Sequence, residues 1–426
     1  MNKMRRNAFV KESLNTSKKT IWIVNQYCSV DNETSRQACM ARYLEKLGYD
    51  VMIFTSKKQK DKTSVEKIEF CEKNGVKYCQ IILKDYGKSK IRRVLSTIEF
   101  QRKVVKSVRT VGEAPQILIS NFAGIFGNIL FKLKKKAKTK IILDILDFWP
   151  EVFVDLGYIK KNSIIAKFLY KMEYKSYSGC DSLFFSVQGG KDYIIEKGWD
   201  LAHGGKVNAD NIFYVNNGID FNSMSADCTE NVFEDTDLDT DKFKVVYVGA
   251  IGAPNNIDLL VETAKLAQEL KYYDIEFLVY GNGNKLNTVS KLAQSYNLKN
   301  IKFKGFVNKK YSPNIISRCN VSILNFRDMP TLRFGISNNK FFLYCVAGKP
   351  IISTVKPNYD LVETKNCGIV VKHTPESILD GILQIKNCDL QQYDKYCRNA
   401  LSVAKEFDYN NILQPLKNEV QRLLNG

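Results

Sequence analysis

The sequence predicts an α/β protein built from two doubly wound, mainly parallel sheets. Short β-branched runs alternate with helical patterns, and the alternation stops at an acidic stretch and then begins again. Strands that alternate with helices of about 10–15 residues form parallel sheets with helices on both faces. The length of 426 residues agrees with two domains, since one domain commonly spans about 100–200 residues.

The first alternation contains the predicted strands of an N-terminal domain. They are short apolar runs at 20–25, 51–55, 76–83, 116–120, 140–146, 182–187 and 212–215. Helical patterns lie between most of them. The clearest is at 35–47, where Ala38, Ala41, Leu44 and Leu47 share one face.

Residues 222–242 (NSMSADCTENVFEDTDLDTDK) are acidic and polar and have no apolar period, which indicates an interdomain linker. Predicted strands then follow at 244–248, 275–280, 300–304, 320–324, 350–353 and 368–371, with helices at 256–270, 284–296, 338–347 and 375–385. The predicted domains are therefore 1–221 and 243–405, joined by the linker 222–242. A C-terminal helix at 406–426 is expected to pack back on the N-terminal domain.

The composition excludes several classes of site. Eleven cysteines without a CxxC pair indicate reduced, mostly buried thiols rather than disulfides or a zinc site. The only histidines, His203 and His373, are far apart, which argues against a histidine metal centre and a Ser-His-Asp hydrolase. No run approaches 18 apolar residues and the basic start lacks an apolar core, so we expect a cytoplasmic protein.

The net charge of +19 is concentrated in the first third of the chain. Residues 1–150 hold 31 Lys/Arg and 14 Asp/Glu, whereas residues 151–426 hold 33 and 31. A solvated surface explains this excess, and so does attraction to an anionic membrane surface or a lipid-diphosphate substrate through residues 84–140. Nucleic acid is not expected as a partner, because no aromatic-interleaved basic motif is visible.

Glycines follow two strands of the second alternation. Gly249 and Gly252 come after 244–248, and Gly281 and Gly283 come after 275–280. Glycine at such a strand-to-helix turn lets backbone N–H groups approach a phosphate, although a tight turn alone also explains it. Lys285 then begins a helix, where a cation is unfavourable unless an anion is bound.

The segment 335–353 (GISNNKFFLYCVAGKPIIS) is the most specific in the chain. Ser337 or Asn338 can cap a helix, which leaves N–H groups at its start free for a ligand. Lys340 lies in the first turn of that helix, again a cation at the unfavourable end unless it meets an anion.

This segment resembles the donor-site motif of bacterial family 4 glycosyltransferases that build capsule and O-antigen units. Further likenesses follow in the family's order along nearly the whole chain, at 25–47, 147–157 (DFWPEVFVDLG), 186–198, 216–220 (NNGID), 249–252 and 281–283. The resemblance implies the GT-B fold, which consists of two facing Rossmann-like domains with the ligand cleft between them.

The resemblance also implies roles for individual residues. The donor diphosphate would be held by Lys340 and the N–H groups of 337–339 (Ser337, Asn338, Asn339), with contributions from Lys285 and from Gly249, Gly252, Gly281 and Gly283. Asp147 would orient an acceptor hydroxyl, or else cap the turn at Trp149–Pro150. Arg36 would meet an acceptor phosphate, or else be a surface arginine.

This chain departs from the family at two positions. Gly335 and Leu343 stand where family members commonly carry two glutamates, and the second glutamate usually holds the ribose of the nucleotide. Donor affinity, or activity itself, could therefore be altered.

The implied reaction moves a sugar from a UDP- or GDP-linked donor to a lipid-linked or soluble glycan, with retention and without a metal or other cofactor. The only DxD triplets, from Asp235, lie in the acidic segment rather than at a strand end, which suits a metal-free scheme. A catalytically silent binding partner and a nucleotide-sugar 2-epimerase remain alternatives. A peripheral position on the inner face of the cell membrane is expected.

Overall fold

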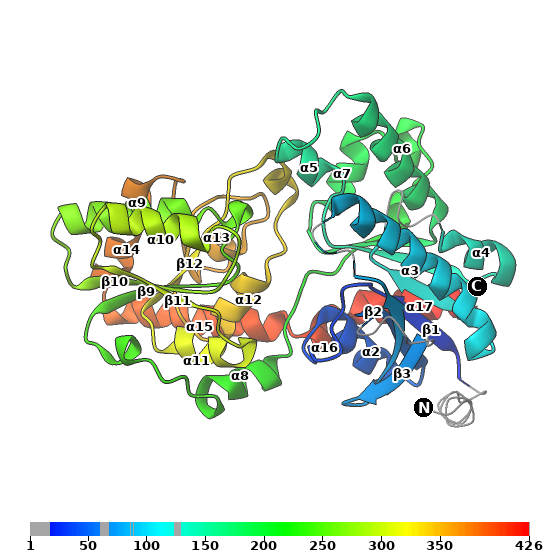
Figure 1. Cartoon of the computed structure of the whole chain (residues 1–426), viewed down its shortest axis with the longest axis horizontal. Coiled ribbons are helices and arrows are strands. Elements are labelled where there is room, and N and C mark those ends of the chain that lie inside the picture. The colour runs from blue at the N-terminus through cyan, green and yellow to red at the C-terminus, as the bar shows by residue number, and fades with distance from the viewer. Residues whose placement is uncertain (1–17, 60–67, 86, 88, 123–128, 426) are drawn as a thin grey trace. The chain divides into compact units, whose positions relative to one another are not determined.

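The computed structural model describes residues 18–59, 68–85, 87, 89–122 and 129–425, and the chain divides into two units. The first unit contains the chain up to Asn216 and from Ile412 onward, and the second contains Asn217–Asn411. Each unit is built on one sheet with helices packed against it (Figure 1). The predicted α/β class with two doubly wound sheets is confirmed.

The sheet of the first unit has the order β3-β4-β2-β1-β5-β6-β7-β8. Neighbouring strands are parallel except β3 and β4, which are antiparallel. The strands are β1 (Thr20–Val24), β2 (Asp50–Lys58), β3 (Ile68–Lys73), β4 (Val76–Leu83), β5 (Ile117–Ser120), β6 (Lys140–Ile145), β7 (Ser182–Phe185) and β8 (Ile212–Tyr214). The edge strand β3 was not predicted, because its sequence IEFCEK is too polar to stand out as a strand.

The helices of the first unit are α2 (Arg36–Lys46), α3 (Lys90–Val111), α4 (Phe131–Ala137), α5 (Glu151–Asp155), α6 (Ile164–Gly179), α7 (Gly190–Glu196), η2 (Leu201–His203), η3 (Ala209–Asn211) and α17 (Gln414–Asn425). Serine side chains cap three of them. Ser35, Ser89 and Ser163 each accept a hydrogen bond from the amide three residues further on, at the starts of α2, α3 and α6. Such a cap satisfies a first-turn donor that has no partner within the helix.

The second unit has an all-parallel sheet in the order β11-β10-β9-β12-β13-β14. Its strands are β9 (Phe243–Val248), β10 (Ile275–Tyr280), β11 (Ile301–Gly305), β12 (Val321–Leu324), β13 (Ile351–Ser353) and β14 (Gly368–Val370). The strand order changes direction between β9 and β12, and in open α/β sheets ligands bind at the carboxyl ends of the strands beside such a point.

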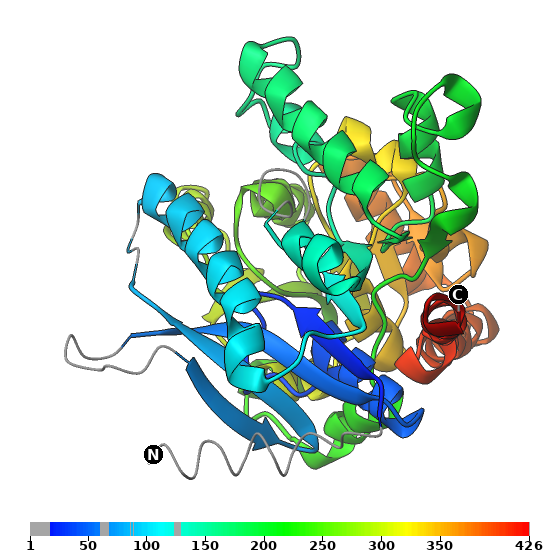
Figure 2. The same ribbon diagram turned by 90° about the vertical axis from the view of Figure 1, so that its right-hand side faces the viewer.

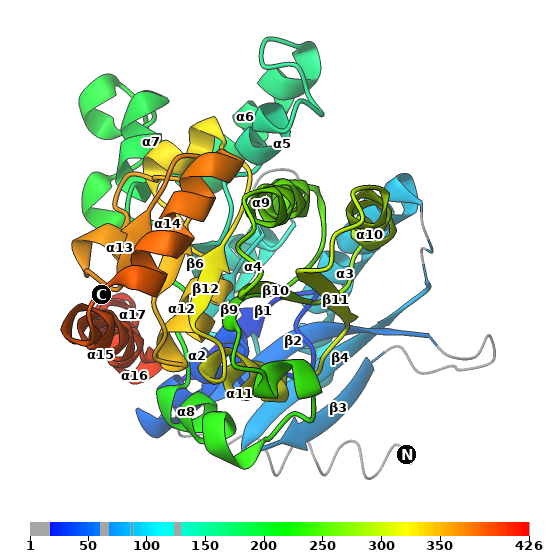
Figure 3. The same cartoon turned by 90° about the vertical axis from the view of Figure 1, so that its left-hand side faces the viewer.

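Helices cover both faces of this sheet (Figures 1 and 3). They are α8 (Phe221–Glu230), η4 (Thr236–Asp239), η5 (Ala253–Asn255), α9 (Ile257–Glu269), α10 (Leu286–Ser295), η6 (Lys309–Tyr311), α11 (Ser312–Ser317), η7 (Pro330–Phe334), α12 (Asn339–Val346), α13 (Leu361–Thr364), α14 (Pro375–Asn387) and α15 (Leu390–Glu406), and the short α16 (Tyr409–Ile412) spans the boundary between the units. Apolar residues of α9, α10 and α14 form one buried core with the strands.

The last residues of the chain return to the first unit. There Leu413, Leu416 and Val420 are almost fully buried. The hydroxyl of Ser182, at the start of β7, hydrogen-bonds with the carboxylate of Glu419 on α17. The structure begins this returning segment at 412, whereas the sequence placed its start at 406.

The predicted linker at 222–242 is not a linker. The structure places the whole segment in the second unit, where Asp220 caps α8 and Asn314 of α11 hydrogen-bonds to the backbone of Cys228 and Phe233. The boundary between the units instead falls at 216–217, five residues before the predicted end of the first domain. The acidic composition has another cause.

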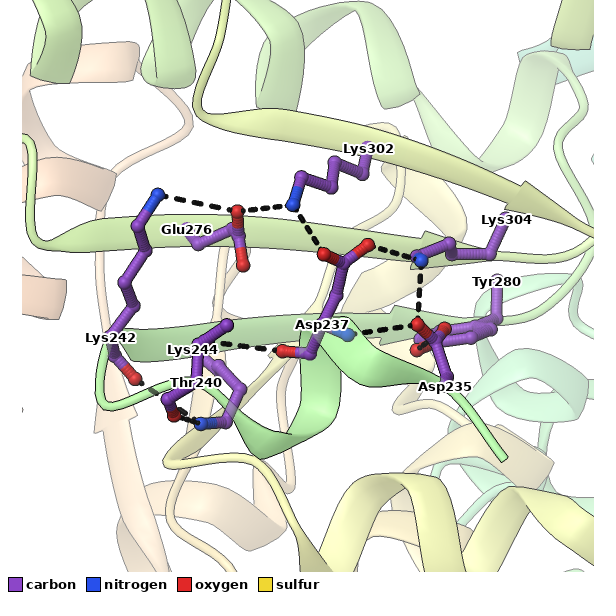
Figure 4. Close-up of polar contacts among 9 residues, drawn as sticks. All are labelled: Asp235, Asp237, Thr240, Lys242, Lys244, Glu276, Tyr280, Lys302 and Lys304. Carbon is purple, nitrogen blue, oxygen red and sulfur yellow. Dashed lines mark hydrogen bonds and ion pairs between the residues drawn. The ribbon is translucent and has the colours of Figure 1, made fainter. Parts of the chain in front are cut away.

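That cause is the charged face of the sheet that the segment covers (Figure 4). Lys302 and Lys304 of β11 donate to Asp237, and Lys304 also donates to Asp235 at 2.7 Å. Lys302 further pairs at 2.9 Å with Glu276 of β10, which is fully buried. The acidic residues therefore neutralise the lysines of an edge strand, and the segment is folded protein.

None of the described helices combines the length and apolarity that crossing a bilayer requires.

The Asp237 contacts generate a stability prediction. Hydrogen bonds from Lys302 and Lys304 lower the pKa of Asp237, so its contribution is complete above the unfolded pKa near 4 and is lost as the pH falls through the folded value. Asp237→Asn is expected to destabilise the second unit by on the order of 1 kcal/mol at pH 7. Thermal unfolding should show this difference shrinking at pH 3. Glu234→Gln, at an exposed acid of the same segment, is the control, and equal effects of both variants would contradict the assignment.

Candidate functional site

The loops after β9 and β10 touch backbone to backbone, and glycine makes this possible. A Cβ on Gly281 would lie 1.8 Å from the carbonyl oxygen of Gly249, and a Cβ on Gly283 would lie 2.1 Å from that of Ile251. No other residue fits at either position without moving the backbone. Gly281 and Gly283 are therefore required by the contact between the loops, whatever the ligand.

Most of the predicted glycine N–H donors are already in use. The amide of Gly249 donates to the carbonyl oxygen of Tyr280 at 3.0 Å, and that of Gly281 donates to Gly305 at 2.7 Å. The amide of Gly283 donates to the side chain of Asn282. Among the described residues the amide of Gly252 has no partner, and a Cβ there would make only ordinary contacts. Of the four predicted glycine donors, the amide of Gly252 is therefore the one left unpaired among the described residues.

Lys340 lies beside the first of these loops. Its Nζ donates to the hydroxyl of Tyr247 at 3.1 Å and to the side-chain oxygen of Asn255, and it lies 4.8 Å from the centre of the Tyr247 ring. A Cβ on Gly249 would lie 2.8 Å from Cδ of Lys340. Gly249 thus makes room for the lysine stem, a role that the sequence did not reveal.

The ammonium group of Lys340 has no acidic partner within the described part of the chain. Burial therefore disfavours its charged form and lowers its pKa to about 7. A bound anion would reverse this effect by favouring the charged form. A partly buried cation with neutral contacts only, at the start of a helix, is suited to a negatively charged ligand.

The start of α12 adds donors to the same region. Asn338 caps the helix, and its side-chain oxygen accepts the amide of Lys340 at 2.9 Å. Asn339 is exposed, and its amide has no partner among the described residues. The hydroxyl of Ser337 accepts the amide of Asn217 at 3.3 Å. Of the predicted 337–339 group, the Asn339 amide is thus the one available to a ligand.

Lys285 is the N-cap residue of α10, and its amide donates to the carbonyl oxygen of Ile251 at 3.1 Å. Its side chain is half-buried and has no partner within the described residues. The backbone of Lys285 therefore contacts, at Ile251, the same loop whose Gly249 lies beside the Lys340 side chain. Two cations without acidic partners and two unpaired amides form the candidate anion site.

A polar network holds the turn that contacts Lys340. Asn325 donates to the carbonyl oxygens of Asn255 and Asn256, and its own oxygen accepts the hydroxyl of Thr354. The ring of His373 lies 2.8 Å from the Asn256 side chain. This network was not predicted, since its one local signal is the Asn-Asn pair after Pro254, whose second residue, Asn256, has a left-handed backbone. The network holds the backbone of Asn255, and the Asn255 side chain, which donates to the carbonyl oxygen of Ala250 at 2.9 Å, accepts Lys340.

The structure shows why two positions differ from the resembled family. Gly335 adopts φ 93° and ψ −175°, a backbone conformation available essentially to glycine only. Leu343 is buried within α12. A glutamate therefore cannot occupy position 335 with this backbone, and position 343 offers no charge to a ribose.

The predicted acceptor role of Arg36 is wrong. Its Nε and Nη2 donate to the two carboxylate oxygens of Asp144 at 2.9 and 2.7 Å. Its Nη1 and Nη2 also donate to the carbonyl oxygens of Asn216 and Val215. The guanidinium is buried and occupied, so Arg36 joins α2 to β6 and to the segment after β8. The sequence offered one sign of this ion pair: Asp144 is the only acid in the otherwise apolar strand KIILDI and needs a buried cation.

Asp147 lies just beyond the carboxyl end of β6. The side chain is exposed, and its carboxylate has no hydrogen-bond partner within the described residues. The alternative role of capping the turn at Trp149–Pro150 is not supported, because no amide of the described residues donates to this carboxylate and α5 has no side-chain cap. Desolvation by surrounding protein raises the pKa of the carboxyl, although the side chain reaches the surface. Asp147 remains available to hold a hydroxyl group.

A basic hollow of about 270 Å³ lies at the carboxyl ends of β1, β2 and β4. Its rim includes Lys57, Lys58 and Lys84, together with the exposed ring of Tyr27. Lys57 pairs with Glu69 and Lys58 with Asp85, whereas Lys84 has no partner among the described residues. This arrangement offers a cation and an aromatic surface to a small anionic group.

A larger hollow of about 660 Å³ lies under the segment 232–239. Its cations are already neutralised, since Lys304 pairs with Asp235 and Arg318 with Asp239. Across the described residues no group of three or more His, Cys, Asp and Glu side chains could hold a metal ion. This larger hollow therefore has no free cation among its described lining residues to offer an anion.

Comparison with known proteins finds one matching family model and a set of solved structures with the same fold. Residues 229–402, which contain the loops and α12, match the family described as "Glycosyl transferases group 1". A search of curated proteins found no match.

Several solved structures share the fold over nearly the whole chain. Anabaena Alr3699/HepE, in complex with UDP and glucose, is 14% identical with a TM-score of 0.66, covering 95% of this chain and 100% of that one. The α,α-trehalose 6-phosphate synthase of Burkholderia multivorans is 10% identical with a TM-score of 0.71, covering 96% and 97%. A glycosyltransferase from Rickettsia africae ESF-5 is 14% identical with a TM-score of 0.60, covering 96% and 99%. The chain therefore has the two-domain GT-B fold, and the part of its second unit at 229–402 matches the glycosyl transferases group 1.

Proposed function

We propose that this protein is a retaining glycosyltransferase that moves a sugar from a nucleoside diphosphate sugar to a phosphate-bearing, lipid-linked glycan in surface polysaccharide synthesis. The supporting observation is Lys340, a partly buried cation with neutral partners beside the loop after β9. A family match that contains this site and UDP in the HepE structure of the same fold support a UDP-linked donor.

The donor site would act on the leaving group. As the bond between the sugar carbon and the phosphate oxygen breaks, its electron pair remains on the diphosphate. Lys340, Lys285 and the amides of Gly252 and Asn339 would stabilise this charge, with the dipole of α12 adding to it. No metal is needed for this step, since two lysines and fixed amides supply the positive field.

The acceptor hydroxyl would attack the same carbon on the face that the phosphate leaves, and its proton would pass to a phosphate oxygen. Asp147 would orient that hydroxyl by accepting its hydrogen bond. The basic hollow at β1, β2 and β4, with Lys84 and Tyr27, would hold the phosphate and sugar of the acceptor in place of Arg36. The reaction would take place at the inner face of the cell membrane.

A second candidate function is a catalytically silent partner that binds the donor without turnover. Gly335 and Leu343 favour it, because neither supplies the carboxylate that usually holds the ribose.

A panel of UDP- and GDP-sugars separates these functions. A ligand at about 100 times its dissociation constant stabilises a protein by roughly 2.7 kcal/mol, which thermal unfolding detects. Stabilisation followed by sugar transfer to native lipid acceptor, unchanged by EDTA, would support the proposal. Stabilisation without transfer would favour the silent partner, and no stabilisation by any donor would refute both.

Lys340→Ala is expected to weaken UDP binding about 10- to 100-fold, because charge-assisted hydrogen bonds contribute about 1.5–3 kcal/mol each. Calorimetric titration with UDP measures the loss. Lys291→Ala, at an exposed lysine on α10, is the matched control and should bind as the wild type does. Equal affinity of the Lys340 variant and the wild type would remove this lysine from the site.

The affinity for UDP is expected to fall as the pH rises above about 7. Burial lowers the pKa of Lys340 to about 7, so the free protein loses the charged form above that value, whereas bound diphosphate favours it. The dissociation constant should therefore rise by up to about tenfold per pH unit between pH 7 and 9. The dependence should vanish in Lys340→Ala, and a flat wild-type profile would show that the lysine does not bind the anion.

Lys84→Ala is expected to raise the acceptor KM about two- to fivefold, since an exposed charge contact contributes up to about 1 kcal/mol. The KM for the donor should not change, because Lys84 belongs to the other unit. Steady-state kinetics with each substrate varied in turn provides the test, with Lys106→Ala on α3 as an exposed-lysine control. A larger change in donor KM than in acceptor KM would contradict the acceptor role.

A further inference from the structure

The basic helix α3 lies within the 84–140 surface that was expected to meet a membrane, but few of its described apolar side chains are exposed. Phe100 and Val104 are fully buried, and Val111 is nearly so. Val94 and Leu95 are the large apolar side chains of α3 that stand exposed among its described side chains. The 84–140 surface therefore offers charge with little apolar area.

A second surface of the first unit combines positive charge with exposed apolar side chains. The loop between α5 and α6 and the first turns of α6 project away from the eight-stranded sheet (Figure 2). Four large apolar side chains are exposed there: Tyr158 (69%), Ile164 (86%), Ile165 (64%) and Phe168 (53%). We call this surface, residues 158–175, the α6 tip. Adjacent apolar side chains exposed to this degree mark an interaction surface on a folded protein.

The charges of the α6 tip are almost all positive. It contains five lysines (Lys160, Lys161, Lys167, Lys171 and Lys175) and one acid, Glu173. The five lysines are exposed and have no ion-pair partner in the part of the chain that the structure describes. Glu173 is fully buried on the opposite face of α6, where it accepts the hydroxyl of Tyr193. The exposed face of α6 is therefore apolar in its first turns, and further lysines follow along the helix.

The helix that carries this face is firmly anchored. Ala166 and Tyr177 are buried, and the hydroxyl of Tyr170 donates to Glu151 at 2.7 Å. Ser163 caps the helix by accepting the amide of Ala166 at 3.1 Å. A capped first turn has fewer bare N–H groups to dehydrate when it enters an apolar environment. The apolar residues are thus presented by a fixed helix end.

We propose that the α6 tip inserts Tyr158, Ile164, Ile165 and Phe168 into an anionic lipid surface while its lysines contact the headgroups. Charge complementarity selects this occupant: shallow insertion of apolar side chains beneath a ring of cations is the pattern of interfacial helices. A protein partner or a second copy of the chain would leave five unpaired lysines unexplained. The proposal does not depend on sugar transfer.

Vesicle binding by the full chain tests the proposal. Wild-type protein should sediment with vesicles that contain phosphatidylglycerol and much less with phosphatidylcholine alone. Ile164→Glu/Phe168→Glu should reduce the partition coefficient at least tenfold. Leu390→Glu, at an 85% exposed leucine in the first turn of α15, is the matched control and should bind like the wild type. Calorimetry with UDP should give the same result for all three proteins, which separates this outcome from the donor site.

A fluorescence measurement locates the contact. Phe168→Trp should shift its emission to the blue when phosphatidylglycerol vesicles are added and should not shift with phosphatidylcholine. Equal vesicle binding by the double variant and the wild type would overturn the proposal, as would a loss of binding only after charge reversal within 84–140. A wild-type dimer in lipid-free solution that becomes a monomer in the double variant would also overturn it, because the tip would then be a self-association surface.

Discussion

The position of Lys340 depends on one constraint, the direct backbone contact between the loops after β9 and β10. Gly281 and Gly283 allow that contact, and Gly249 leaves the space through which the lysine stem passes. The ammonium group then lies among a phenol, an amide and the N-terminal turn of α12, away from any carboxylate of the described residues. A lysine held this way has lost much of its hydration without gaining a counter-ion, so an arriving diphosphate would find a partner that is already desolvated.

The sequence predicted the fold well because the fold is recorded in local periodicity. All thirteen predicted strands have a counterpart, since most of them are short apolar runs buried in a parallel sheet. The missed strand, β3, lies at a sheet edge and is half polar. The acidic stretch was misread for the opposite reason: its carboxylates pair with lysines that lie about 65 residues further along the chain. No local pattern can show such a pairing.

The candidate site was predictable only in outline. Motif order identified the glycines, Lys285 and Lys340, but it could not tell which amides were already bonded. Arg36 shows the same limit of sequence-based prediction. The sequence around an arginine on a helix does not tell whether the side chain meets a ligand or a buried aspartate such as Asp144. The sequence of the α6 tip contains the apolar and basic run IIAKFLYK, yet a helical stripe of that kind usually packs inward. Exposure on the folded chain distinguishes the two cases.

The return of the chain after residue 411 has a topological consequence. The first unit is made from two separate stretches of sequence, and the polypeptide passes between the units twice, near 216 and near 411. Neither a cut at 216 nor one at 411 releases an intact first unit, because α17 and its Glu419 contact to Ser182 would be lost. Recombination that exchanges whole units between related proteins would need two crossover points, because the sequence of the second unit is inserted within that of the first.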